Sequence, residues 1–188
     1  TSRGLGDVYK RQRAPCVSVR VHIPAQHTHN VEAALRAALA TTGVRLETGE
    51  VLQESQLQQA FDACGASLAV EGNHAGVNVS LDVPADQDVP RLLKYLRAGF
   101  ASPTVSAEDF SRKQHFLAEI AVGAECDVGS TARRLFSECV FHHPKDPRRL
   151  TDGATTAARL NGVGRESALQ GLQELASRGA FVTCVAPD

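Results

Sequence analysis

The sequence lacks several features that mark particular classes of protein. It contains no Met and no Trp, only 5% of its residues are aromatic, and no uninterrupted run of 18 apolar residues occurs in it. We therefore expect no membrane-spanning helix. We also expect no signal peptide, because the sequence has no charged segment that leads into an apolar stretch. Basic charge is not in excess either, because 20 Lys and Arg residues stand against 21 Asp and Glu residues. This balance argues against binding to DNA or RNA.

The 188 residues that are present include 43% hydrophobic residues, which at this length predicts one globular domain. A chain without Met does not begin at its own initiator, so we expect Thr1 to be the edge of a fragment. Residues 1–12 show no apolar period, and residues 7–12 resemble a translated sequencing adapter. We expect residues 1–12 to be a non-native leader and residues 13–188 to be a single, truncated domain.

Apolar residues alternate with polar ones in three parts of the chain, which is typical of half-buried strands. Residues 17–23 alternate up to Pro24, residues 66–71 and 77–83 flank a Gly-containing turn, and residues 180–186 form a last Val-rich segment. The pattern predicts an opening strand, a hairpin and a closing strand.

Helical spacing fills the segments between these strands. The predicted caps are Asn30, Ser55 with Gln58, Asp88, and Ser106 with Asp109. The predicted helices cover residues 30–39, 55–64, 88–96, 106–125, 128–140, 154–160 and 165–177. This order predicts an α+β domain with a mostly antiparallel sheet that helices cover on one face.

Several segments, in order, are similar to one family. Residues 65–73 with the strand 77–83 look like its hairpin signature, and residues 100–103 with the helix 108–120 look like its next two helices. His143-Pro144 and the closing residues 181–188, with Pro187 at a Gly position, also match. The chain thus resembles a domain of the insulinase/pitrilysin family of zinc metallopeptidases. The resemblance implies the fold of a metallopeptidase half, similar to mitochondrial processing peptidase.

The chemistry of that family depends on the motif H-x-x-E-H, in which two His hold zinc and Glu activates water. When Gly43 is placed on the glycine after the motif, Ala34, Ala37 and Ala38 stand at the three functional positions. Alanine offers no lone pair to a metal, and Glu119, a weak match to the third ligand, cannot hold zinc alone. The resemblance therefore implies a domain that does not hydrolyse peptides, with zinc expected in the catalytic domain of a full-length relative.

A second domain type in the family closes over the substrate with an Arg and a Tyr. Counted from Gly65, these positions fall on Phe61 and Leu68, which are both apolar. The resemblance implies a non-catalytic structural domain that forms a chamber wall and inter-domain contacts. Its partners would be homologous peptidase domains in cis or in trans, with a peptide substrate in the full assembly.

Two other hypotheses stay open. One is a structural subunit of a larger assembly without protease activity, as in the core subunits of the respiratory cytochrome complex. The other is an unrelated α+β module that shares only the topology.

Most polar residues are expected to serve the surface. His27 with His29 lacks a Cys, Asp or Glu at metal-binding spacing. His142 and His143 lie in a loop that Pro144 and Pro147 make stiff, which favours a structural role, and Glu50 and Glu54 lie among Gln residues. The Cys residues show no C-x-x-C spacing and four of them fall in apolar patterns, which predicts buried free thiols. Free thiols favour a reducing compartment, the cytoplasm or an organelle matrix, over the periplasm. They are Cys16, Cys64, Cys126, Cys139 and Cys184.

Overall fold

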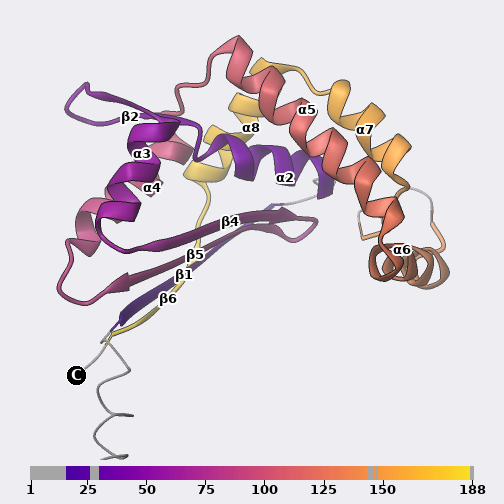
Figure 1. The fold of residues 1–188 in the computed structure, drawn as a ribbon, viewed down its shortest axis with the longest axis horizontal. Coiled ribbons are helices and arrows are strands. Elements are labelled where there is room, and N and C mark those ends of the chain that lie inside the picture. Colours follow the sequence, from indigo (N-terminus) through magenta and orange to yellow (C-terminus); the bar gives the residue numbers. More distant parts are fainter. Residues whose placement is uncertain (1–15, 26–29, 144–145, 147, 187–188) are drawn as a thin grey trace, which may run out of the picture.

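The computed structural model describes residues 16–25, 30–143, 146 and 148–186. The expected leader, His27, His29, Pro144 and Pro187 lie outside this part. A four-stranded antiparallel sheet forms its base, with the strands in the order β4-β5-β1-β6 (Figure 1). The strands are β1 (Cys16–Pro24), β4 (Ser67–Asn73), β5 (Gly76–Pro84) and β6 (Phe181–Val185).

The sheet has one apolar and one polar face, because side chains alternate along each strand. The apolar residues of β5, Val77 to Val83 at every second position, are at most 3% exposed. On the opposite face Arg20 Nη2 donates to Asp82 Oδ2 over 3.0 Å, and His22 Nδ1 lies 2.7 Å from Asn78 Oδ1. The helices that the structure describes lie on the apolar side of the sheet (Figure 1). The predicted fold class is confirmed.

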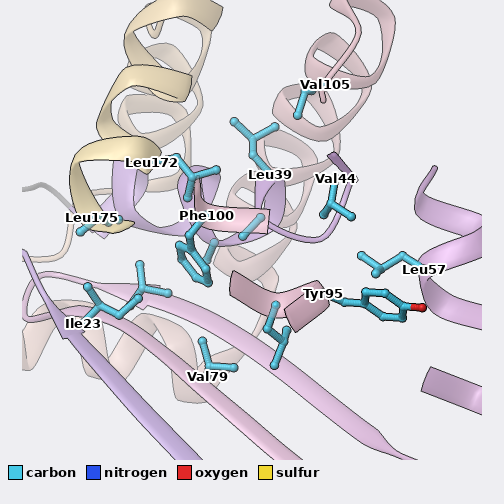
Figure 2. Close-up of a cluster of buried hydrophobic side chains, with 14 of the residues drawn as sticks. Ile23, Leu39, Val44, Leu57, Val79, Tyr95, Phe100, Val105, Leu172 and Leu175 are labelled. Atoms are coloured by element: carbon cyan, nitrogen blue, oxygen red, sulfur yellow. The ribbon is translucent and has the colours of Figure 1, made fainter. Parts of the chain in front are cut away.

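Three helices cover the middle of the sheet and form the core with it. They are α2 (Asn30–Leu39), α4 (Val89–Ala101) and α8 (Arg165–Ser177). Figure 2 shows Leu39, Phe100 and Leu172 from these helices above Ile23 and Val79 of the sheet. Burial of such side chains contributes about 1.5–3 kcal/mol each. The core thereby fixes α2, the helix that carries the positions of the expected zinc motif.

A second group of helices extends away from the sheet. It consists of α5 (Ala107–Gly123), the short 3-10 helix η1 (Ala124–Cys126), α6 (Val128–Val140) and α7 (Gly153–Asn161). Helices α5 and α7 approach closely at Gly153, where an added Cβ would lie 2.4 Å from the carbonyl oxygen of Ala121. In Figure 1 α6 lies at the outer end of α5, away from the sheet.

The ends of the helices agree with the sequence in part. Asp88 accepts a hydrogen bond from the Arg91 amide over 3.1 Å and Ser106 accepts one from the Asp109 amide over 3.0 Å, so both predicted caps are confirmed. The capping box predicted at Ser55 is wrong. Helix α3 (Glu54–Ala63) begins one residue earlier, with Gln53 as its cap.

The reason for this difference is a short hairpin that the sequence analysis missed. Strands β2 (Gly43–Arg45) and β3 (Val51–Gln53) pair with each other, and β3 runs directly into α3. Asn30, the expected cap, is the first residue of α2, and its side-chain oxygen accepts a hydrogen bond from the His74 amide over 2.5 Å. Helix α2 is thereby joined to the β4–β5 turn.

The predicted burial of the Cys residues is wrong. All five are free thiols, and only Cys64 is partly buried. Cys139 lies on an exposed face of α6 and Cys184 on the edge strand β6, two elements whose apolar residues also face solvent. The expected compartment stays a prediction. None of the described helices is long and apolar enough to cross a membrane.

Candidate functional site

The first position of the expected zinc motif, Ala34, lines a cavity of about 270 Å³ between α2, α5 and α7. Helix α5 contributes Leu117, Ile120 and Ala121 to its wall. The charged groups at the cavity are Arg149 and Arg159, and within the described residues its lining holds no His, Cys, Asp or Glu. This lining does not fit a metal cation, because it presents positive charge and no anionic donor.

The other two motif positions, Ala37 and Ala38, line a separate recess of about 140 Å³. The same recess is lined by Phe61 of α3 and Leu68 of β4. The structure therefore brings together residues that the sequence analysis assigned to two different sites, a zinc motif and a substrate clamp. We call this space the apolar recess.

The polar groups at the apolar recess are Thr41 and Gln58. The Thr41 hydroxyl donates to the carbonyl oxygen of Ala38 over 3.3 Å, and the Gln58 amide nitrogen donates to Asp62 Oδ1 over 2.8 Å. Neither group titrates near neutral pH, so neither can act as a general base. Among the described residues that line the apolar recess, none is a general base for a water molecule.

Glu119, the weak match to a third ligand, lies on the solvent side of α5. Its side chain is 66% exposed, and its Oε1 lies 3.2 Å from His115 Nε2. Leu117 and Ala121 occupy the face of α5 that reaches the cavity at Ala34. Glu119 is thus absent from the lining of both the cavity and the apolar recess. The described residues contain no group of three His, Cys, Asp or Glu side chains arranged to hold a metal ion.

Glu54 holds two helices together rather than serving as a plain surface residue. It accepts hydrogen bonds from Arg112 and Lys113 of α5, the former over 2.8 Å. Partial burial raises the pKa of Glu54, but these hydrogen bonds outweigh burial and the pKa lies below its usual range. The charged form therefore stabilises the contact between α3 and α5.

The loop after α6 carries the His pair of the sequence analysis. His142 and His143 are exposed. Nearby, hydrogen bonds from the side chain and backbone of Arg148 lower the pKa of Asp146 to about 2. This carboxylate stays charged near neutral pH and fixes the loop by bonding to Arg148. Glu50, by contrast, closes a tight turn, where its carbonyl accepts from the Leu46 amide over 2.8 Å.

Two surfaces were not identified from the sequence. One is the outer face of α6, on which the apolar residues point to solvent. The other is a cavity of about 330 Å³ between α4 and the β2–β3 turn, which four basic residues line. A helical spacing of basic residues at 91 and 94 is the sequence signal for the second, and it is a common one on solvated helices.

Compared by sequence, the chain matches no family model and none of the curated proteins. Solved structures do match it. A protease from Helicobacter pylori superposes with a TM-score of 0.71 at 10% identity, over 92% of this chain and 41% of that one. Pitrilysin gives a TM-score of 0.66 at 14% identity, over 93% of this chain and 19% of that one. An inactive M16 peptidase domain from Pseudomonas fluorescens gives a TM-score of 0.60 at 16% identity, over 89% of this chain and 47% of that one.

These likenesses establish the fold. The chain has the architecture of an M16 peptidase domain, as the resemblance to the insulinase/pitrilysin family implied. It spans less than half of each of the three similar proteins. Identities this low show the fold alone and carry no activity with them.

Proposed function

We propose that this chain is a non-catalytic structural domain of an M16-type zinc metalloendopeptidase. The observation that supports the proposal is that alanine stands at Ala34, Ala37 and Ala38, where the resemblance places the three functional positions of the zinc motif. Zinc needs His, Cys or carboxylate donors, and peptide hydrolysis needs a base to activate water. The inactive M16 domain from Pseudomonas fluorescens supports this role by its own description. Zinc would then be held in the catalytic domain of the full protein.

In this role the domain forms part of a chamber wall and contacts a homologous domain. The surface that supports such a contact is the apolar stripe of α6: Val128, Ala132, Leu135, Phe136, Cys139 and Val140. These positions recur at the period of one helix face. Val128 is 84% exposed and Phe136 is 70% exposed.

Helix α6 faces its own domain with polar side chains. Ser137 is buried at 5% exposure, accepts a hydrogen bond from the Leu150 amide over 2.7 Å, and donates to the carbonyl of Arg148. The apolar stripe on the other side of α6 is exposed, with Val128, Leu135, Phe136 and Val140 each about half exposed or more, and contiguous exposed apolar patches are often functional. A patch of this kind favours burial against a second protein surface.

We assign that surface to a homologous domain. The chain spans 41% of the Helicobacter pylori protease and 47% of the Pseudomonas fluorescens domain, so each contains a further stretch at least as long as the part that matches. A second domain of this size is large enough to cover the apolar stripe of α6.

The α6 contact predicts a change in hydrogen exchange. Amides of α6 are expected to exchange more slowly in the full gene product than in the isolated 188-residue chain, because a partner domain covers the stripe. Phe136→Glu is expected to restore fast exchange in the gene product while leaving the melting temperature of the isolated chain unchanged. Phe136→Leu, which keeps an apolar side chain at the same position, is the control and should leave the slow exchange in place. Equal exchange of α6 in both proteins would refute the contact.

The alternative function is a structural core-type subunit of an assembly with no protease activity. The two functions differ in what surrounds the chain. Cleavage of an unstructured peptide by the full gene product with its natural partners, abolished by a zinc chelator and restored by added zinc, is the result that our proposal predicts. A complete lack of cleavage in every assembly would favour the alternative.

A further inference from the structure

A cavity lies between α4 and the β2–β3 turn, at the opposite end of the molecule from α6 (Figure 1). Its volume is about 330 Å³, near the lower limit of sites that hold small organic ligands, roughly 300–1,000 Å³. Four cationic side chains line it: Arg45, Arg91, Lys94 and Arg97. We call it the basic pocket.

The charge of the basic pocket is largely uncompensated. Glu47 is the one carboxylate among the lining residues, and its Oε1 lies 3.9 Å from Arg97 Nη1. Both side chains are more than 80% exposed, so this rim pair holds neither group firmly. Arg45 and Lys94 form no ion pair with any residue that the structure describes. The basic pocket therefore attracts anions.

One of the cations is fixed in place. Arg91 Nε donates to the Tyr95 hydroxyl over 2.7 Å, and its guanidinium carbon lies 5.6 Å from the centre of the Tyr95 ring. Tyr95 is 7% exposed, and Figure 2 shows it next to Leu57 at the edge of the core. This buried ring orients Arg91, and a guanidinium presents further N–H groups for a carboxylate.

The rest of the lining selects among anions. Leu46 and Ala98 add apolar surface, which suits a ligand with aliphatic parts better than a bare inorganic ion. The amides of Arg45 and Leu46, which could otherwise bind a phosphate, donate to the carbonyls of Ser102 and Glu50. Anion recognition thus falls to side chains that are spread around the cavity, an arrangement that suits several carboxylates along one chain.

We propose that the basic pocket binds an acidic segment of a peptide chain, with Arg45, Arg91, Lys94 and Arg97 contacting its carboxylates. The apolar stems of these side chains, together with Leu46, accept the methylene groups of Asp and Glu. The pocket is independent of the non-catalytic role proposed above, because it shares no residue with the apolar recess or with the α6 stripe.

Isothermal titration of the 188-residue chain with a blocked hexapeptide of Glu tests the proposal. We expect measurable binding that weakens as salt is raised, because exposed charges are screened. The double variant Arg45→Gln/Lys94→Gln is expected to weaken binding at least tenfold. Both side chains are exposed and neither donates a hydrogen bond within the described residues, so the fold should be retained. A matched hexapeptide of Gln should not bind.

The matched control is Arg133→Gln/Arg178→Gln, which removes the same charge at two residues that do not line the basic pocket. It should leave the affinity unchanged. If the control loses as much affinity as Arg45→Gln/Lys94→Gln, binding depends on the net charge of the chain and the proposal is wrong. The proposal is also overturned if the wild-type chain does not bind the peptide at millimolar concentration. Tripolyphosphate that binds more tightly than the peptide, with the same loss in Arg45→Gln/Lys94→Gln, would assign the pocket to phosphate compounds instead.

Discussion

Replacing Gly72 with Ala is expected to lower the free energy of unfolding by about 3 kcal/mol. Gly72 lies in β4 directly under α2, and an added Cβ would stand 2.0 Å from the carbonyl oxygen of Ala33 and 2.1 Å from its carbonyl carbon. Both are backbone atoms, so no side-chain rotation relieves the clash. Helix α2 would have to move out of the core that it forms with α4 and α8. Urea unfolding followed by circular dichroism measures the loss.

Gly123→Ala is the control for this prediction. Gly123 ends α5 with helical backbone angles, and no heavy atom lies within 4 Å of its added Cβ. Alanine has the higher helix propensity, so the variant should be as stable as the wild type or up to about 1 kcal/mol more stable. A loss at Gly72 no larger than the change at Gly123 would show that β4 and α2 are not in close contact.

Phe61→Ala is expected to cost about 3–5 kcal/mol of stability. Phe61 is 1% exposed, and truncation would open a cavity beneath the apolar recess. Leu68→Ala should cost less, because Leu68 is only partly buried. Thermal and urea unfolding of the two variants give the comparison.

This prediction separates a packing role for Phe61 from a role in substrate binding. If Phe61 contacted a peptide, as its place at the expected Arg position of the clamp suggests, truncation would change peptide affinity with little change in stability. A stable Phe61→Ala variant with altered peptide binding would contradict the account of the apolar recess as part of the core.

Much of the fold was predictable because the sheet has one wet face. The alternation of apolar and polar residues in 77–83 predicts both the strand and its buried side, because the apolar residues at every second position are the buried ones. The caps at Asp88 and Ser106 followed from local chemistry alone. The β2–β3 hairpin was not predictable, because three residues per strand are too few to show a period.

Periodicity also does not say which face of a helix has a partner. The apolar spacing of α6 predicted a helix correctly, yet its stripe faces solvent and its polar side, with Ser137, faces the domain. The same reasoning failed for Cys139 and Cys184, which lie in apolar patterns on elements that nothing in the described part of the chain covers. Hydrophobic patterns report what a surface prefers, and the described residues leave apolar side chains of α6 and β6 exposed.

The geometry of the candidate site was not predictable from the sequence. The sequence predicts that Ala34, Ala37 and Ala38 stand at the positions of a zinc motif, where alanine offers no metal ligand. Their separation into two spaces, and the meeting of Ala38 with Phe61 in one of them, arises from the packing of α2, α3 and β4. The basic pocket was not predictable from the sequence, because its cations come from two segments that are distant in sequence.

Zinc content and peptide cleavage, measured together on the 188-residue chain, test the central claim most directly. The chain is equilibrated with zinc, freed of excess metal, and assayed against a fluorogenic peptide with and without chelator. The account predicts no stoichiometric zinc and no chelator-sensitive cleavage, because no zinc ligand or general base stands at the motif positions. One zinc per chain together with cleavage that the chelator abolishes would contradict it.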